Sequence, residues 1–310
     1  MTAAPIALFV YNRPIHTRQT IEALLRNELA SDSELYIFCD GPKGAVPEPA
    51  MTELRRYVHG IRGFRNIHIT EQPRNLGLSR SIIAGVTQLC EEYGRVIVLE
   101  DDLVTSPWFL RYMHDALQLY ADNERVASIH GYCYPVTGPP LPETFFMRGG
   151  DCWGWATWSR AWRHFNPDGA HLLSELTRRG LLRAFDLDDS YGFAQMLRAQ
   201  VAGKVDSWAV RWHAACFLDD LYTLYPGRSL VNNIGFDSSG RHSGTDTRFE
   251  TVLATSAIQV RTIEVEQSAR AAAAFGQFLK DLKPALVRRV TSAVARRLRA
   301  SIPFQRELRK

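Results

Sequence analysis

The residues most suited to chemistry are three adjacent carboxylates, Glu100-Asp101-Asp102. They follow residues 95–99, a mainly apolar run that is typical of a buried strand. Like charges packed so closely raise one another's pKa unless a cation neutralises them. Mg²⁺ and Mn²⁺ prefer carboxylate oxygens together with diphosphate oxygens, so the run predicts a metal and diphosphate site. The alternative is a solvated acidic turn in which Asp102 caps the next helix.

Polar residues also follow two earlier apolar runs. Asn12 and Arg13 come after residues 6–11, and Asp40 comes after residues 34–39. The forked donors of Arg13 suit a phosphate group, and the carboxylate of Asp40 could accept a hydrogen bond from a base or a ribose hydroxyl. The alternatives are a surface arginine and a simple turn, because Asp-Gly and Gly-Pro are common turn dipeptides.

A further candidate lies at the start of a helical pattern. Ser79 and Arg80 follow a turn that contains Arg74 and Asn75. The free N–H groups at a helix N-terminus can bind an anion, so Ser79 is a candidate nucleotide contact. A plain helix cap is an equally good interpretation.

Alternating strands and helices position these residues. Apolar runs predict strands at 6–11, 34–39, 67–70 and 95–99. Helical spacing predicts helices at 17–29, 51–60, 79–93, 107–121, 172–185 and 191–201. This alternation implies an α/β fold with a mostly parallel central sheet and helices on both faces. Ligands of such sheets bind beyond the carboxyl ends of the strands, where the polar residues described above fall.

Composition and motifs exclude several classes of protein. The 310-residue chain has 45% hydrophobic and 23% charged residues, which is typical of a globular protein. No apolar run is long enough to span a membrane, and the N-terminus lacks the basic region of a secretory signal. The five cysteines form no C-x-x-C pair, so a reducing cytoplasm is expected. The sequence also lacks the glycine-rich dinucleotide and P-loop motifs and the zinc- and serine-hydrolase motifs.

The positive charge is concentrated at the C-terminus. Residues 280–310 carry a net charge of +8, whereas the rest of the chain carries −4. The overall charge of +4 therefore does not indicate a nucleic-acid-binding surface across the protein. Apolar residues at mostly four-residue spacing beside arginine pairs predict a basic amphipathic helix. Such a helix favours peripheral contact with an anionic membrane surface, and a solvated helix packed on the domain is the alternative.

Four segments in one order resemble the GT-A-fold nucleotide-sugar glycosyltransferases. They are Val10-Tyr-Asn-Arg-Pro14, Phe38-Cys-Asp-Gly-Pro42, Asn75-Leu-Gly-Leu-Ser79 and Val98-Leu-Glu-Asp-Asp102-Leu103. The sequence is most similar to family-2-like bacterial enzymes and to the N-acetylglucosaminyltransferase I group, which also carries a Glu-Asp-Asp motif. The resemblance covers about residues 5–245 and implies a UDP-sugar donor, with a Mn²⁺ or Mg²⁺ ion bridging its diphosphate.

The same resemblance implies roles for individual residues. Asp102 would be the direct metal ligand, and Glu100 and Asp101 would face the ribose and the donor sugar. Asp40 would contact the uracil. The remaining implied nucleotide contacts are Tyr11, Asn12, Arg13 and Ser79.

The second half contains a candidate general base. Lys204-Val-Asp206-Ser-Trp208 resembles the family's catalytic segment, in which a carboxylate precedes a tryptophan. Asp206 would take the proton from the acceptor hydroxyl as that hydroxyl attacks the anomeric carbon. A base of this kind implies in-line displacement with inversion. Asp219 and Asp220 are competing candidates, and Asp206 could instead be a helix N-cap.

Two further segments resemble parts of the family's cleft. Residues 235–244 resemble its flexible loop, in which Arg241 and His242 would contact the diphosphate. An exposed polar loop is the alternative. Trp153 and Trp155 would line the cleft, because indole rings stack on the apolar faces of sugars.

Together these observations predict one domain at 1–262, followed by a basic tail at 263–310. A nucleotide-binding half (1–105) and an acceptor half (106–262) make up the domain. The expected activity is transfer of a hexosyl or N-acetylhexosaminyl group from a UDP-sugar to a glycan or lipid-linked saccharide, in surface polysaccharide synthesis. The expected location is the cytoplasm, with residues 280–310 on the inner face of the plasma membrane. A sugar-nucleotide nucleotidyltransferase and a non-catalytic glycan- or membrane-binding domain are the alternatives.

Overall fold

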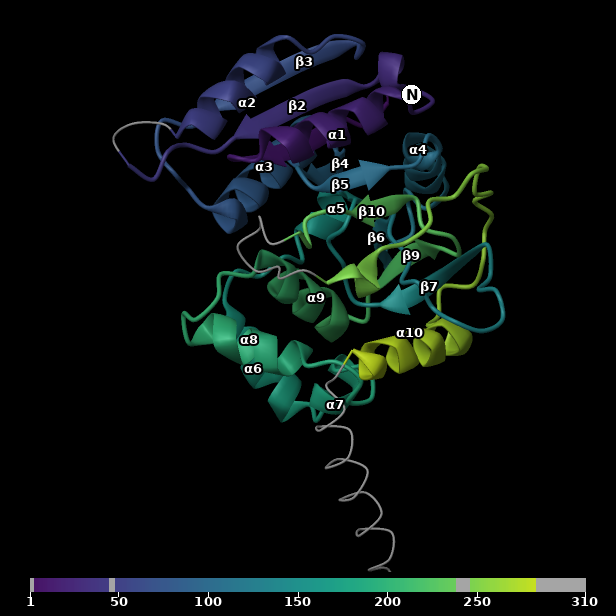
Figure 1. Cartoon of the computed structure of the whole chain (residues 1–310). Helices are drawn as coiled ribbons and strands as arrows, with labels where there is room; N and C mark the ends of the chain where they lie inside the picture. The colour runs from purple at the N-terminus through teal and green to yellow at the C-terminus, as the bar shows by residue number, and fades with distance from the viewer. Residues whose placement is uncertain (1–2, 45–47, 238–245, 283–310) are drawn as a thin grey trace, which may run out of the picture.

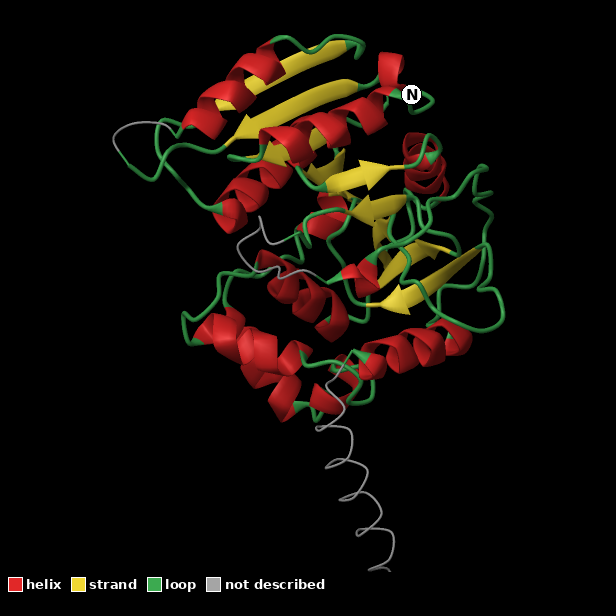
Figure 2. Ribbon diagram, viewed as in Figure 1, coloured by secondary structure: helices red, strands yellow, loops and turns green. Residues whose placement is uncertain are grey.

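A computed structural model describes residues 3–44, 48–237 and 246–282. Within these residues, helices cover both faces of a large mixed sheet (Figures 1 and 2). The strands are β1 (Ile6–Val10), β2 (Glu34–Cys39), β3 (Asn66–Glu71), β4 (Arg95–Glu100), β5 (Leu103–Thr105), β6 (Val126–His130), β7 (Thr144–Arg148), β8 (Trp155–Trp158), β9 (Tyr222–Pro226) and β10 (Val231–Asn233). The helices are α1 (Pro14–Leu25), α2 (Pro49–His59), α3 (Leu78–Tyr93), α4 (Phe109–Leu119), α5 (Ser159–Trp162), α6 (Gly169–Arg178), α7 (Leu182–Phe185), α8 (Phe193–Val201), α9 (Trp208–Leu218) and α10 (Ala269–Asp281), with short 3₁₀ turns η1 (Ala30–Asp32) and η2 (Thr247–Phe249).

The strands of the eight-stranded sheet have the order β3-β2-β1-β4-β8-β6-β9-β7. The first four pair in parallel, and β6 pairs in parallel with β9. β8 runs antiparallel to β4 and β6, and β7 runs antiparallel to β9. β5 and β10 form a separate antiparallel pair. The predicted α/β fold with a mostly parallel sheet is therefore confirmed.

Burial explains the sequence of the central strands. Every residue of β1 is buried, as are the four central residues of β4. Parallel strands that are covered on both faces have continuous apolar sequences, which is why these two runs were recognisable. β3 lies at the edge of the sheet, and its residues alternate between exposed and half-buried positions over most of its length.

The connections between the first four strands place the helices on both faces. The chain passes from β1 to β2 to β3 in one direction across the sheet and then returns to β4 beside β1. Because parallel crossovers are right-handed, α1 and α2 cover one face and α3 covers the other. Accordingly, α1 packs on α2, whereas α3 packs on α5 and α9 (Figure 1). The direction of winding thus reverses between β1 and β4.

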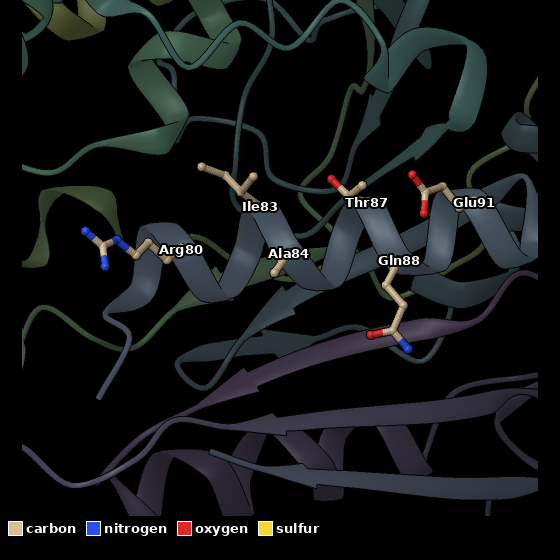
Figure 3. A pocket seen from close by; sticks show the side chains of 6 residues that line it. All are labelled: Arg80, Ile83, Ala84, Thr87, Gln88 and Glu91. Atoms are coloured by element: carbon tan, nitrogen blue, oxygen red, sulfur yellow. The ribbon is translucent and has the colours of Figure 1, made fainter. Parts of the chain in front are cut away.

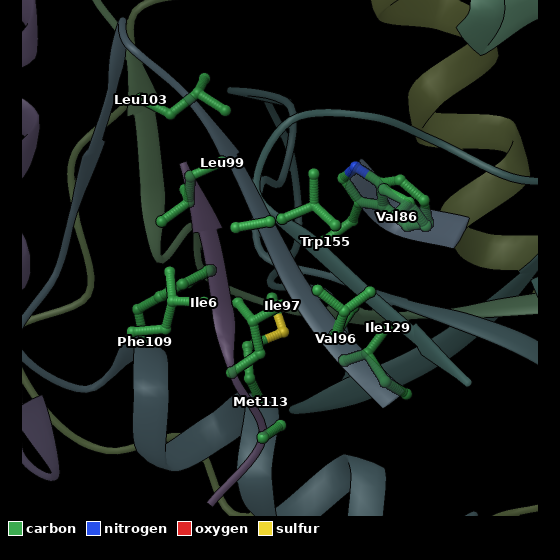
Figure 4. Packing of buried hydrophobic residues seen from close by; sticks show 14 of the residues in the cluster. Ile6, Val86, Val96, Ile97, Leu99, Leu103, Phe109, Met113, Ile129 and Trp155 are labelled. Atoms are coloured by element: carbon green, nitrogen blue, oxygen red, sulfur yellow. The ribbon is translucent and has the colours of Figure 1, made fainter. Parts of the chain in front are cut away.

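Trp155 of β8 lies in the core between the sheet and the helices. Figure 4 shows its indole close to Val86 of α3, with Val96 of β4 and Ile129 of β6 in the same cluster. The indole also stacks on Trp208 of α9, with 5.3 Å between ring centroids. This packing fixes the start of α9 relative to β4 and α3.

The predicted helix at 172–185 is wrong in its length. Two helices occupy this segment, because α6 ends at Arg178 and α7 begins at Leu182. Gly180 lies between them with a φ of +67°, a left-handed conformation that ends helices and favours glycine.

Helix α10, the last in the described residues, packs on the body of the protein. Phe275 and Leu279 are buried, and Phe275 contacts Phe145 of β7. Helix α10 therefore packs on β7, within residues 106–262, and the division after residue 262 into a domain and a tail stays a prediction. Residues 283–310, which hold most of the predicted basic membrane-contacting helix, lie outside the described residues. Among the described residues, no helix is long and apolar enough to cross a membrane.

Candidate functional site

The ends of β1 and β4 bring the predicted acidic and basic residues together. The two strands pair in parallel, with Phe9 opposite Glu100. Their following residues therefore leave the sheet at the same edge. The strand order makes this edge the point where the winding direction reverses. In open α/β sheets, ligands bind in the crevice at such a point.

Arg13 contacts both aspartates of the acidic run. Its Nη2 atom donates to Asp101 Oδ1 and, at 2.7 Å, to Asp102 Oδ2. The exposed fraction of the side chain is 18% for Arg13, 7% for Asp101 and 14% for Asp102. Thr20 of α1 also donates to the carbonyl oxygen of Asp101 over 2.9 Å. The guanidinium of Arg13 is thus a cation that neutralises part of the negative charge of the acidic run.

The electrostatics of the cluster follow from its burial. Burial raises the pKa of Glu100, and the neighbouring Asp102 and Asp101 raise it further. Burial also raises the pKa of Asp101, against the opposing effect of Arg13. For Arg13, burial lowers the pKa, but the two aspartates more than compensate and the net shift is upward. The site therefore holds more carboxylate than its one arginine balances, which favours an additional cation.

The residues at this edge can supply only a few ligands, so they fit a metal ion whose other ligands come from the substrate. Among the described residues, no group of three His, Cys, Asp or Glu side chains could hold a metal ion. Asp102 can supply one carboxylate beside Arg13. Mg²⁺ is commonly held by one or two carboxylates together with substrate phosphates, and this arrangement suits that pattern.

Gly235 packs directly against the carboxylate of Asp102. A Cβ atom at this position would lie 2.1 Å from Asp102 Oδ2, so a larger residue would displace that carboxylate. The backbone N–H of Ile234 donates to the carbonyl of Asp102 over 2.9 Å. Asp237, two residues after Gly235, places its Oδ2 atom 3.0 Å from Nε2 of His16 on α1. The segment after β10 thus covers the acidic run and contacts α1.

Asp40 holds the loop that precedes α3. Its Oδ1 accepts from the backbone N–H groups of Gly41 and Leu76, both at 2.8 Å. Its Oδ2 accepts from Asn75 Nδ2 at 2.9 Å and from the backbone N–H of Gly77 at 3.0 Å. These four contacts give Asp40 a structural role, and its contact with a base stays a prediction.

Ser79 does not face the edge of the sheet as expected. The residue retains only 2% of its exposed surface. Its hydroxyl accepts from Nη2 of Arg211 over 2.7 Å. Because α9 buries Ser79, no surface of this residue is left for a nucleotide. The expected direct contact between Ser79 and a nucleotide is therefore not made.

Asp206 precedes α9 and is exposed, with 66% of its side-chain surface accessible. Ser207, not Asp206, is the N-cap of α9, because the Ser207 hydroxyl accepts from the backbone N–H of Val210. Asp206 Oδ1 instead accepts from Nη2 of Arg211 over 3.2 Å. Burial lowers the pKa of Arg211, and the carboxylate of Asp206 opposes this shift.

The competing carboxylates lie at the other end of α9. Asp219 is the C-cap of the helix and lies 2.6 Å from Nδ1 of His164. Asp220 pairs with Arg148 over 3.1 Å. An 11-residue helix is about 16 Å long at 1.5 Å per residue, so these residues and Asp206 cannot serve the same reacting atom.

The two candidate tryptophans occupy different environments. Trp153 is half-buried and packs edge-on against Phe236 and Phe249, with both centroid distances at 5.6 Å. Trp155 is fully buried in the core. The expectation that Trp155 lines the cleft therefore needs correction, because its ring can act only through the residues packed on it.

The remaining predicted residues lie around the same edge or outside the described residues. Asn12 donates to Glu48 Oε2 over 3.0 Å. The ring of Tyr11 lies 5.5 Å from Nζ of Lys43. Arg241 and His242 lie outside the described residues, so their contact with a diphosphate stays a prediction.

Sequence reasoning missed Arg211, His16 and the phenylalanines beside Trp153. Arg211 carried a recognisable signal, because it is an arginine inside the otherwise apolar start of a helix, Trp208–Leu218. His16 and Phe236 carried none, since only the folded chain places them near the acidic run.

A surface depression lies away from these residues. Its lining comes entirely from α3 and consists of Arg80, Ile83, Ala84, Thr87, Gln88 and Glu91 (Figure 3). Since it contains none of the residues at the strand ends, we do not assign the site to it.

Neither a protein-family model nor a curated protein matches this chain. Solved structures with similar arrangements include a mannosyltransferase from Pyrobaculum calidifontis in complex with GDP-Man and Mn²⁺, at 8% identity and a TM-score of 0.38, with 70% of this chain and 69% of that chain covered. A putative nucleotide-diphospho-sugar transferase from Desulfovibrio desulfuricans matches at 14% identity and a TM-score of 0.35, with 55% and 68% covered. S. aureus TarS (residues 1–349) matches at 10% identity and a TM-score of 0.32, with 50% of this chain and only 47% of the TarS chain covered. These similarities are too distant to assign an activity.

Proposed function

We propose that this protein is a nucleotide-sugar glycosyltransferase that transfers a sugar from a UDP-sugar to a saccharide hydroxyl. The observation that carries the proposal is the contact of Arg13 with Asp101 and Asp102 between the ends of β1 and β4. A cation and excess carboxylate at this position suit a diphosphate and its metal ion. The sequence motifs that resemble GT-A glycosyltransferases include all three residues.

In the proposed reaction, Arg13 binds the diphosphate through its forked donors. Asp102 would hold a Mn²⁺ or Mg²⁺ ion, which when bound supplies positive charge to the departing diphosphate. Asp206 takes the proton from the acceptor hydroxyl while the oxygen of that hydroxyl forms a bond to the anomeric carbon. The bond from that carbon to the diphosphate breaks, and its electron pair leaves with UDP. Attack opposite the leaving group inverts the anomeric centre.

Release of nucleoside diphosphate from a panel of UDP-sugars and other nucleotide-sugars tests this proposal. The purified protein receives each donor with Mn²⁺ and a mixture of simple saccharide acceptors. We expect release with one donor class, abolition by EDTA, and a loss of about 10²- to 10⁴-fold in Asp206→Asn. Asp219→Asn is the matched control and should retain wild-type activity, since Asp219 lies at the far end of α9.

Two results would argue against parts of this scheme. If another nucleotide-sugar is turned over in place of UDP-sugars, the donor assignment is wrong and the reaction class stands. If Asp206→Asn retains full activity while Asp219→Asn does not, the base is misassigned.

A further inference from the structure

Arg211 connects the two halves of the protein beneath Asp206. Its Nη2 atom donates to Ser79 Oγ at 2.7 Å and to Asp206 Oδ1 at 3.2 Å. Ser79 lies in the first turn of α3, in the proposed nucleotide-binding half, and it is 132 positions from Arg211. The Arg211 side chain retains 9% of its exposed surface, whereas the Asp206 side chain retains 66%. A buried cation thus contacts an exposed carboxylate.

The remaining donors of Arg211 fix its own position. Nε donates to the carbonyl of Ser207 at 3.1 Å, and Nη1 donates to the carbonyl of Pro167 at 3.2 Å. The guanidinium is therefore anchored by backbone on two sides and by α3 on a third. Since an anchored planar guanidinium loses little freedom on binding, it can select one orientation of the aspartate.

Arg160 shows what a purely structural arginine looks like in the same protein. Its guanidinium donates to three backbone carbonyls, those of Tyr120, Ala121 and Val126, at 2.6 to 2.9 Å. It makes no hydrogen bond to a carboxylate. Arg211 has backbone partners as well, but it also contacts Asp206, and that contact leaves Asp206 Oδ2 without a donor among the described residues.

We propose that Arg211 is the positioning residue for Asp206, holding its carboxylate in one rotamer with Oδ2 directed to the acceptor hydroxyl. This inference rests on the proposed glycosyl transfer. An exposed aspartate otherwise populates several rotamers, and a misplacement of about 1 Å can reduce the rate about 10²-fold. The contact with Ser79 makes the orientation of Asp206 depend on the nucleotide-binding half.

A double-mutant cycle on turnover tests the inference. The single variants are Arg211→Met, which removes the cation, and Asp206→Asn, which removes the base, and the third variant carries both changes. Arg211→Met should lower kcat about 10- to 100-fold with little change in KM for the donor. In the Asp206→Asn background, Arg211→Met should lower kcat by no more than about twofold, because its effect acts through Asp206.

Two further variants keep the test valid if Arg211→Met folds poorly. Arg211→Lys retains the positive charge but not the forked donors of the guanidinium. Its kcat should lie between that of Arg211→Met and that of the wild type. Arg160→Lys is the matched structural control, and its kcat should remain at the wild-type value when the folded fraction is taken into account.

The inference is overturned if Arg211→Met costs as much in the Asp206→Asn background as in the wild type. It is also overturned if Arg160→Lys loses as much kcat as Arg211→Lys. Absence of turnover by the wild-type protein is a different result, because it contradicts the proposed function and removes the role of Arg211 with it.

Discussion

Replacing Arg13 with methionine should destabilise the protein in a pH-dependent way. The change leaves Asp101 and Asp102 without the cation that both contact. Removing one partner of a buried ion pair costs about 3–5 kcal/mol. Because Arg13 retains 18% of its side-chain surface, we expect the lower end, about 3 kcal/mol at pH 8.

The pH dependence follows from the raised pKa of the acidic residues. Burial raises the pKa of Glu100 and of Asp101 in the folded protein above the values of the unfolded chain. A carboxyl group of this kind contributes stability below its unfolded pKa, about 4, and that contribution is lost as pH rises through its folded pKa. Without Arg13 the carboxylates repel one another more strongly, so the loss should be larger at pH 8 than at pH 5.

Urea unfolding followed by tryptophan fluorescence measures the effect at both pH values. We expect the difference between wild type and Arg13→Met to shrink to about 1 kcal/mol at pH 5, where protonation relieves the repulsion. Arg160→Met is the control, because Arg160 donates to backbone carbonyls and its loss should cost the same at both pH values. Equal losses for Arg13→Met at pH 5 and pH 8 would refute the reasoning.

Three further predictions concern other residues. Asp40→Ala leaves the backbone N–H groups of Gly41, Leu76 and Gly77 without their acceptor, so it should cost about 2–3 kcal/mol and speed amide exchange at Leu76 and Gly77; unchanged exchange would contradict this. Gly235→Ala puts a Cβ 2.1 Å from Asp102 Oδ2 and should weaken Mn²⁺-dependent UDP binding about tenfold or more, a loss of about 1.4 kcal/mol, whereas Gly44→Ala, with open space around it, should not. The pKa of His114 is lowered to about 4 by burial and by Arg95 and Arg111, so stability should fall as pH drops from about 6.5 towards 4. His114→Gln should flatten that slope by about 1–3 kcal/mol in urea unfolding at pH 7 and 4.5, and an unchanged slope would show that His114 is not its source.

The central sheet was predictable because its physics is local. β1, β2 and β4 are covered on both faces, and their apolar runs are visible without any knowledge of partners. The parallel order then brings Arg13 and the Glu100-Asp101-Asp102 run to one edge. Hence the meeting of Arg13 with the acidic run at one edge of the sheet could be predicted. The direct contact of Arg13 with Asp101 and Asp102 could not, because the sequence pointed only to a metal ion there.

The parts that could not be predicted depend on distant contacts. The bond between Ser79 and Arg211 joins residues 132 positions apart, and it buries a serine that local sequence places at an exposed helix start. Trp155 reads as a candidate for the cleft because of its neighbours, but its place in β8 between β4 and β6 buries it. In both cases tertiary packing decides exposure, and no local pattern encodes it.

Thermal unfolding in the presence of nucleotides tests the central claim most directly. UDP, GDP, CDP, dTDP and ADP are each compared with Mn²⁺ and with EDTA, because a ligand that binds only the folded state raises Tm. The account predicts a rise in Tm with UDP that requires Mn²⁺ and is lost in Asp102→Ala. No rise in Tm with any of these nucleotides would contradict the claim that the edge between β1 and β4 binds a nucleotide-sugar.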